Sequence, residues 1–112
     1  MKNKIYLIDL PEDKSLILVK EYLKDLGYAD KVEIKSFLNK DILEYEIYNY
    51  INYHGKETKV LSKINCGDYL ELLKKIFERE NNVVLQIYPV IKNQKVSFNI
   101  SYSYKTEKTY RK

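Results

Sequence analysis

The acid–lysine pair Glu33-x-Lys35 has the residue types and spacing found in metal-dependent nucleases. Two residues apart on a strand, the two side chains share one face. A separate carboxylate, Asp9 or Asp30, would complete a Mg²⁺ site together with phosphate oxygens. However, Glu57-Thr58-Lys59 repeats the spacing, and 32% of the residues are charged, so such pairs also arise by chance. A nuclease is therefore our third-ranked hypothesis.

The residues most often used for nucleophilic or metal chemistry are scarce in this sequence. His54 is the one histidine and Cys66 the one cysteine. A zinc site or a Cys–His nucleophile pair needs more such residues close together, and the three glycines are too scattered to form a phosphate-binding loop. We expect a non-catalytic protein without a metal or cofactor, in which Cys66 is a small buried apolar side chain.

Tyrosine is the residue that suggests a binding surface. The strand patterns below place five side chains on outward faces: Tyr48, Tyr50, Lys59, Lys63 and Tyr88. A row of small polar residues, Ser97, Asn99, Ser101 and Ser103, would lie beside Tyr88. Exposed tyrosines suit a protein partner, and they also suit unstacked bases when lysines follow the phosphate backbone.

The positive charge is concentrated at the C-terminal end. The chain carries +4, and residues 105–112, with Lys105, Lys108 and Arg111, hold most of it. We expect a single domain over residues 1–104 followed by a basic tail. Because polyphosphate affinity needs several cations together and the body is nearly neutral, a protein partner ranks first and nucleic acid second. A homodimer is a further option.

The clearest structural signal is the run from Asn82 to Lys105. Folded as a hairpin about Asn93-Gln94, it has one fully apolar face, with Val83 opposite Tyr104 and Leu85 opposite Tyr102. A one-residue slip would invert this pattern, so the register is well specified. Pro89 cannot donate a hydrogen bond outward, which predicts a sheet edge or a bulge there.

The first forty residues predict a strand, a helix and a second strand. Residues 4–10 are apolar on both faces, which is typical of an interior strand. Pro11 and two acids open a helix to about Leu26, and residues 31–38 alternate as a strand. This order predicts a right-handed parallel crossover.

Residues 43–53 are ambiguous between strand and helix. As a strand they pair with residues 56–64 about a His54-Gly55 turn, setting Glu46 beside Lys63 and Tyr50 beside Lys59. As a helix they would belong to a winged helix-turn-helix. We favour the strand because of its Tyr and Ile content.

Residues 68–81 form an amphipathic helix, with Asp68 and Glu71 as a capping box. The fold predicted is α+β, a two-layer sandwich of a mixed sheet with two helices on one face, ending in a β-hairpin. No internal repeat is visible in the sequence.

The amino-acid composition indicates the type of genome that encodes the chain and where in the cell we expect the protein. The chain has 12 tyrosines but 3 glycines and 2 prolines, a bias typical of AT-rich genomes such as those of viruses and mobile elements. It shows no long apolar stretch that would indicate a signal peptide or a membrane span, so we expect a cytoplasmic protein. The first-ranked function is a small binding protein that occupies a protein partner, as an inhibitor would, through a Tyr-rich sheet face or edge.

Overall fold

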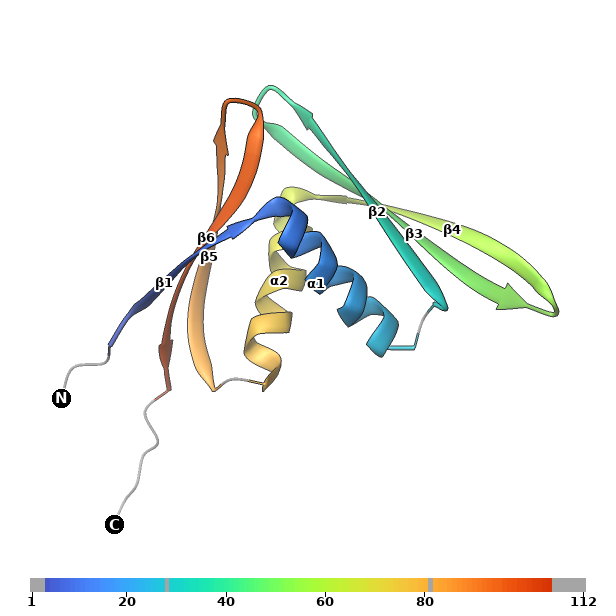
Figure 1. Cartoon of the computed structure of the whole chain (residues 1–112), viewed down its shortest axis with the longest axis horizontal. Helices are drawn as coiled ribbons and strands as arrows, with labels where there is room; N and C mark the ends of the chain where they lie inside the picture. Colours follow the sequence, from blue (N-terminus) through green and yellow to red (C-terminus); the bar gives the residue numbers. More distant parts are fainter. Residues whose placement is uncertain (1–3, 28, 81, 106–112) are drawn as a thin grey trace, which may run out of the picture.

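The computed structural model describes residues 4–27, 29–80 and 82–105. Within these ranges the chain forms two helices and six strands, which confirms the predicted α+β class (Figure 1). In chain order the elements are β1 (Tyr6–Pro11), α1 (Glu12–Asp25), β2 (Lys31–Asn39), β3 (Ile42–Tyr53), β4 (Lys56–Asn65), α2 (Cys66–Glu80), β5 (Val83–Lys92) and β6 (Lys95–Tyr104).

The described strands form two three-stranded sheets rather than the single mixed sheet predicted. Sheet A has the order β1-β6-β5 and sheet B the order β2-β3-β4, and both are antiparallel throughout. The parallel crossover predicted between the first two strands is wrong, because β1 and β2 belong to different sheets. Both helices lie in the angle between the sheets, and each contacts strands of both (Figure 1).

The two long hairpins have the predicted registers. Val83 pairs with Tyr104 in β5–β6, and Tyr50 pairs with Lys59 in β3–β4. Asn93 and Gln94 have φ of 50° and 62°, as a type I′ turn requires. Because residues 43–53 are strand, the winged helix-turn-helix alternative is wrong. β5 lies at a sheet edge, as Pro89 predicted.

The interior strand predicted for residues 4–10 is instead an edge strand. β1 pairs with β6 on one side, and its outward side chain Leu7 is 80% exposed, while Leu10 on the other face is buried. Apolar residues on both faces normally indicate burial on both faces. Here one of the two apolar rows faces solvent, which is relevant to the site described below.

The start of α2 also differs from the prediction. The helix begins at Cys66, and the side-chain oxygen Oδ1 of Asn65 accepts a hydrogen bond from the Asp68 backbone N–H at 2.8 Å. Asn65 therefore caps the helix, and Asp68 lies in its first turn. The capping box predicted for Asp68 and Glu71 is wrong because the helix starts two residues earlier.

The structure contains an internal repeat that the sequence did not reveal. α1 leads into the meander β2-β3-β4, and α2 leads into β5-β6, which β1 completes as a third strand. β4 and β1 each run directly into a helix. The fold is therefore two αβββ units, the second of which takes its last strand from the start of the chain.

Equivalent residues of the two units meet where the helices pack. Ser15 and Tyr69 are each the fourth residue of their helix, and their hydroxyl oxygens lie 2.8 Å apart in the buried core. The Tyr69 ring stacks on Tyr45 of β3 with centroids 3.7 Å apart. This contact joins both helices to sheet B, and Phe98 of β6 packs against Tyr69 from sheet A at 5.7 Å.

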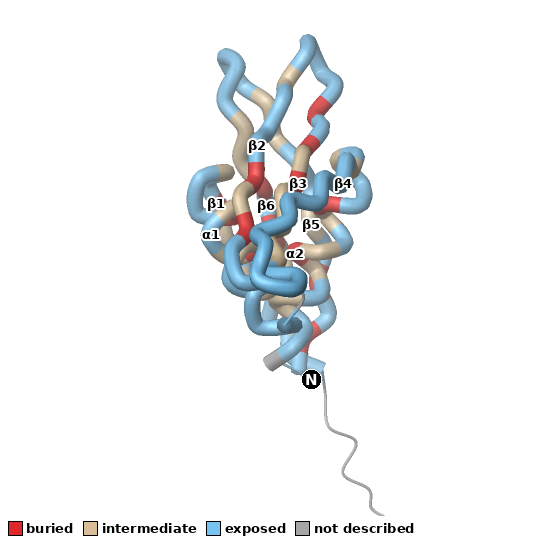
Figure 2. The backbone as a smooth tube through the Cα atoms, turned by 90° about the vertical axis from the view of Figure 1, so that its right-hand side faces the viewer, coloured by how far each residue is buried: buried red, intermediate tan, exposed pale blue. Residues whose placement is uncertain are grey.

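The molecule is extended for its size. Its radius of gyration is 17.0 Å, against about 13 Å for a compact domain of this length. The β3–β4 hairpin projects beyond the helices (Figure 1), and nearly all of β4 is exposed (Figure 2). In the part of the chain that the structure describes, neither helix has the length and apolar character needed to cross a membrane.

Candidate functional site

The outer face of sheet A, turned away from the helices, is a groove with a polar floor and apolar walls. The central strand β6 forms the floor with Ser97, Asn99, Ser101 and Ser103, because its other face carries the buried Phe98 and Ile100. The walls are Ile5 and Leu7 on the β1 side, exposed by 67% and 80%, and Val84 and Tyr88 on β5, exposed by 56% and 55%. We call this surface the sheet A groove.

Two hollows make the groove continuous along β6. One, of about 490 Å³, lies among Leu7, Asp9, Tyr88, Asn99 and Ser101. The other, of about 230 Å³, is lined by Ile5, Val84, Gln86, Ser101 and Ser103. Ser101 lines both, so it marks the middle of the groove.

The centre of the outer face of sheet B is filled by its own side chains, and a hollow of about 310 Å³ lies towards one end, among Phe37, Glu44, Glu46 and Lys63. The Tyr48 hydroxyl donates to Glu46 at 2.6 Å, and the Tyr50 hydroxyl donates to Glu33 at 2.7 Å. The ammonium groups of Lys59 and Lys35 lie 4.5 and 5.4 Å from the Tyr48 ring centroid. These are cation–π distances, so the tyrosine rings already have partners within the chain.

Charges on this face are paired rather than accumulated. Lys63 lies 3.9 Å from Glu46, and Lys31 lies 3.8 Å from Glu33 and 5.0 Å from the Tyr50 ring centroid. The hydrogen bond from Tyr50 lowers the pKa of Glu33, and the same bond raises the pKa of Tyr50. Bonding to Glu46 likewise raises the pKa of Tyr48. Glu33 and Glu46 are therefore the hydrogen-bond acceptors of the two tyrosine hydroxyls.

The internal repeat allows the two faces to be compared position by position. Tyr48 and Ser101 are each the seventh residue of their strand, and Tyr50 and Ser103 each the ninth. Sheet B has large residues along its centre and mainly charged residues on its flanking strands, where Phe37 and Leu61 are the exposed apolar exceptions. Sheet A has small residues at its centre and exposed apolar residues at its flanks. The same scaffold is therefore covered in one unit and left open in the other.

The sequence-predicted site residues divide between these surfaces. Tyr48, Tyr50, Lys59 and Lys63 lie together on sheet B, whereas Tyr88 lies on sheet A. Lys105 is exposed just after β6, and its backbone N–H donates to the Asn82 carbonyl at 2.8 Å. Lys108 and Arg111 lie outside the described residues. The structure thus does not combine the predicted residues into one site.

Sequence reasoning missed the β1 wall of the groove. Ile5 and Leu7 were assigned to an interior strand, because their strand is apolar on both faces. The alternation with Asp9 was the available signal: Leu7 and Asp9 share a face, and a carboxylate on that face is unusual for a buried strand.

The nuclease-type residues are dispersed. Asp9 lies on sheet A, whereas Glu33 and Lys35 lie on sheet B. The Asp30 carboxylate accepts a hydrogen bond from the Asn52 N–H at 3.2 Å. His54 and Cys66 lie at opposite ends of β4, and burial raises the pKa of the Cys66 thiol. Within the described residues no group of three or more His, Cys, Asp and Glu is arranged to hold a metal ion.

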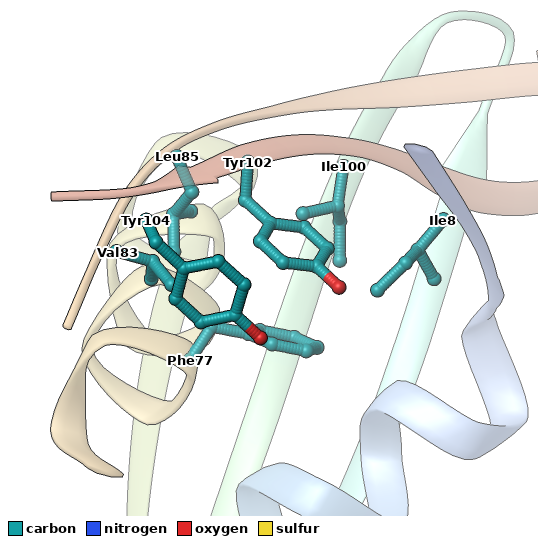
Figure 3. Close-up of a pocket in the computed structure, with 7 residues that line it drawn as sticks. All are labelled: Ile8, Phe77, Val83, Leu85, Ile100, Tyr102 and Tyr104. Carbon is teal, nitrogen blue, oxygen red and sulfur yellow. The ribbon is translucent and has the colours of Figure 1, made fainter. Parts of the chain in front are cut away.

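A further hollow lies on the inner side of sheet A. Figure 3 shows this cavity of about 270 Å³ between the sheet and Phe77 of α2, with the Tyr102 and Tyr104 rings directed towards Phe77. The other lining residues, Ile8, Val83, Leu85 and Ile100, are aliphatic. The cavity is smaller than most ligand pockets, which span about 300–1,000 Å³, and it is lined by neither a carboxylate nor a cationic side chain.

No family model, curated protein or solved structure matches this chain. The geometry of its own surfaces therefore carries the functional argument.

Proposed function

We propose that this chain is a non-catalytic binding protein that occupies a protein partner through the sheet A groove. The observation that carries the proposal is the contrast between equivalent faces. Tyr48 and Tyr50, with their lysine and glutamate partners, cover the centre of sheet B, and its exposed apolar residues Phe37, Ile42 and Leu61 lie at its flanks and turn end. On sheet A, Ile5, Leu7, Val84 and Tyr88 remain exposed around a floor of small residues. A concentration of apolar side chains on one face of a small protein is typical of an interaction site.

The energetics of the groove suit a protein partner. Fully burying a Val, Leu or Ile side chain contributes about 1.5–3 kcal/mol, and three such side chains line the walls. Tyr88 adds a ring whose hydroxyl donates to Gln86 at 2.9 Å, which orients it along the β5 wall. Oriented tyrosines lose little entropy on binding and are enriched among residues that dominate interface energies.

Nucleic acid is less well supported by the described surfaces. The outer face of sheet B carries four lysines, Lys31, Lys35, Lys59 and Lys63, among its described residues, but also Glu33, Glu44, Glu46 and Glu57. Affinity for a phosphate backbone grows with uncompensated cations. Because the two signs balance on this face, it offers little net attraction to a polyanion.

The test is a reciprocal exchange between the two units. Ser101→Tyr places in the groove the residue that sheet B accommodates at the equivalent position, and we expect its ring to block both hollows, since Ser101 lines each of them. Tyr48→Ser is the matched control on sheet B. Both variants and the wild type are used to capture partners from extract of the source cell, with and without nuclease treatment. The affinity of each identified partner is then measured with purified protein.

We expect Ser101→Tyr to weaken the purified complex at least tenfold and Tyr48→Ser to leave it within about twofold. Circular dichroism and thermal unfolding establish that both variants are folded. A partner that binds Ser101→Tyr as tightly as wild type, or that depends on Tyr48 instead, would contradict the proposal. So would a complex that nuclease treatment abolishes.

A further inference from the structure

We propose that the segment bound in the sheet A groove is an extended, largely uncharged apolar stretch of the partner, laid along β6 with an acidic residue over the β5–β6 turn. This inference rests on the proposed function and specifies the chemistry of the occupant. It follows from the repeat distance of the floor, the spacing of the walls and the placement of charge.

The floor repeats at the period of an extended chain. Ser97, Asn99, Ser101 and Ser103 are spaced two residues apart on one strand face, which is about 6.8 Å per step in an antiparallel sheet. A serine hydroxyl can donate to a carbonyl or accept from an N–H. An extended peptide presents an N–H and a C=O towards one side at the same two-residue period. Successive floor residues can therefore bind successive peptide units.

The hydroxyls on the floor are available for such bonds. On sheet B the outward tyrosine hydroxyls bind glutamates, whereas in the described part of the chain the hydroxyls of Ser97, Ser101 and Ser103 have no side-chain partner. Their partial exposure means that water occupies this role in the free protein. Exchanging water for peptide groups keeps each polar group satisfied while the walls are dehydrated.

The walls receive alternate side chains. β1 and β5 flank β6, so the wall strands are separated by about 9.6 Å, which is two interstrand spacings. When the backbone of an extended segment faces the floor, its side chains point alternately to one wall and the other. Odd positions would contact Ile5 and Leu7, and even positions Val84 and Tyr88. The odd-numbered and the even-numbered side chains of the bound segment must therefore both be apolar. An ordinary surface strand, by contrast, has apolar side chains on one face only.

Charge sets the polarity of the occupant. Among the described residues, Asp9 is the acid on this face, level with Asn99, whereas Lys92 and Lys95 form a cross-strand pair of like charges at the turn. The turn end thus carries two cations, against Asp9 beside Asn99 and the single exposed Lys105 just after β6 at the opposite end. This excess of positive charge at the turn complements an apolar segment with a carboxylate at that end. From Ser97 to Ser103 the floor is about 20 Å long, which accommodates about six extended residues.

A helix or a second copy fits the groove less well. A helix satisfies its backbone groups internally and repeats at 5.4 Å per turn, so it would leave the serine row unmatched. A second copy packed face to face would oppose one serine row with another and would not supply a carboxylate to Lys92 and Lys95 from its own turn, which carries the same two lysines.

The experiment uses a displayed library of random heptapeptides, selected on the wild-type protein and counter-selected on Ser101→Tyr. Selected peptides are synthesised, and their affinities are measured for both proteins, for Tyr48→Ser as control, and for Lys92→Glu/Lys95→Glu. Each peptide is also made with single N-methyl groups at successive backbone nitrogens, because N-methylation removes one donor without altering the side chain. Sedimentation velocity of the free protein measures self-association.

We expect apolar, β-branched peptides with an acidic residue at one end, at least tenfold weaker binding to both groove variants, and unchanged binding to Tyr48→Ser. N-methylation should abolish binding at every second position and be tolerated in between. Helix-forming peptides, an N-methyl pattern without this alternation, or a concentration-dependent dimer lost in Ser101→Tyr would overturn the inference. If no peptide is recovered while the captured protein partner still requires Ser101, the extended occupant is refuted but the proposed function stands. If capture is also independent of Ser101, both fail.

Discussion

Four side chains fix the centre of the molecule through a chain of short hydrogen bonds. The Tyr45 hydroxyl donates to the Glu12 carboxylate at 2.7 Å, and Ser15 Oγ donates to the Glu12 carbonyl at 2.7 Å and lies 2.8 Å from the Tyr69 hydroxyl. Burial raises the pKa of both Tyr45 and Tyr69, and for Tyr45 the bond to Glu12 acts in the same direction. The protonated phenols are therefore part of the folded state.

Alkaline pH should destabilise the fold through these phenols. Below about pH 10 a tyrosine is protonated whether the chain is folded or unfolded, so the free energy of unfolding does not change on their account. Above it the unfolded chain loses protons that the folded chain retains. Stability then falls by up to about 1.4 kcal/mol per pH unit for each such tyrosine.

Tyr45→Phe isolates this effect. At pH 7 we expect the free energy of unfolding to fall by about 1–3 kcal/mol, because a hydrogen bond to a charged group disappears. Above pH 10 we expect the free energy of unfolding to decline less steeply with pH than it does in the wild type. Urea unfolding at pH 7, 10 and 11 measures both. Tyr53→Phe, whose ring is exposed, is the control at pH 7. An equally steep alkaline decline in Tyr45→Phe would show that Tyr45 does not retain its proton in the folded state.

The hairpins are the elements that local sequence specified most strongly. Alternation on paired strands fixed the registers of β5–β6 and β3–β4, and the turns His54-Gly55 and Asn93-Gln94 lie where the patterns placed them. The second turn nevertheless holds Gln94 at a positive φ of 62°, where the first turn has Gly55 at 79°. A side chain in this region is strained, whereas glycine is not.

Gln94→Gly is therefore expected to stabilise the protein by about 0.5–1 kcal/mol, since relief of the strain exceeds the added backbone entropy of the unfolded chain. Gly55→Gln is the reverse change, and because nothing lies within 4 Å of the position that its Cβ would occupy, its cost should come from the backbone alone. Thermal unfolding of both variants measures the effect. A destabilised Gln94→Gly would mean that the Gln94 side chain makes a contact worth more than the strain.

What local patterns could not supply was the choice of neighbouring strand. A two-residue repeat of apolar side chains shows which face of a strand is apolar. It does not show which strand pairs with that strand along its second edge. Residues 4–10 have apolar side chains on both faces, and the pattern is the same whether Ile5 and Leu7 pack in a core or wall a groove. The division into two sheets, the edge position of β1 and the groove itself therefore emerged from the tertiary structure.

The candidate site was predictable in part. The row of Ser97, Asn99, Ser101 and Ser103 followed from the hairpin register, and it forms the floor of the sheet A groove, with Tyr88 on the β5 wall. Tyr48 and Tyr50 were correctly placed on an outward face, but single-strand patterns cannot show that Glu33, Glu46 and Lys59 from three strands engage them.

At the scale of the whole molecule, the fold is two αβββ units in which β1 completes the second unit. The start of β1 lies beside the end of β6, because Tyr6 pairs with Tyr102 in an antiparallel ladder. A short linker can therefore join Lys105 to Lys4, with new termini between Pro11 and Glu12. This circular permutant would read as two consecutive αβββ units.

We expect the permutant to fold with the wild-type circular dichroism spectrum and with a stability reduced by at most about 2 kcal/mol, since surface connections are exchanged and the core is kept. Denaturant unfolding checks this. A permutant cut at Gly27 in the loop after α1 serves as control. If the control permutant folds and the permutant cut before Glu12 does not, the covalent connection between β1 and α1 is required for folding. The connection from β6 to β1 then cannot replace it.

The central claim is that the partner binds the sheet A groove and not the face of sheet B. Methyl-labelled Ile, Leu and Val give reporters on each surface: Ile5, Leu7 and Val84 in the groove, Leu61 on the outer face of sheet B, and Ile17 on α1, all exposed in the free protein. Titration with the purified partner, followed by methyl NMR, measures which of them contact it. We predict intermolecular nuclear Overhauser effects and the largest shifts at Ile5, Leu7 and Val84, with Leu61 and Ile17 unchanged. Contacts at Leu61, with silent groove methyls, would contradict the account.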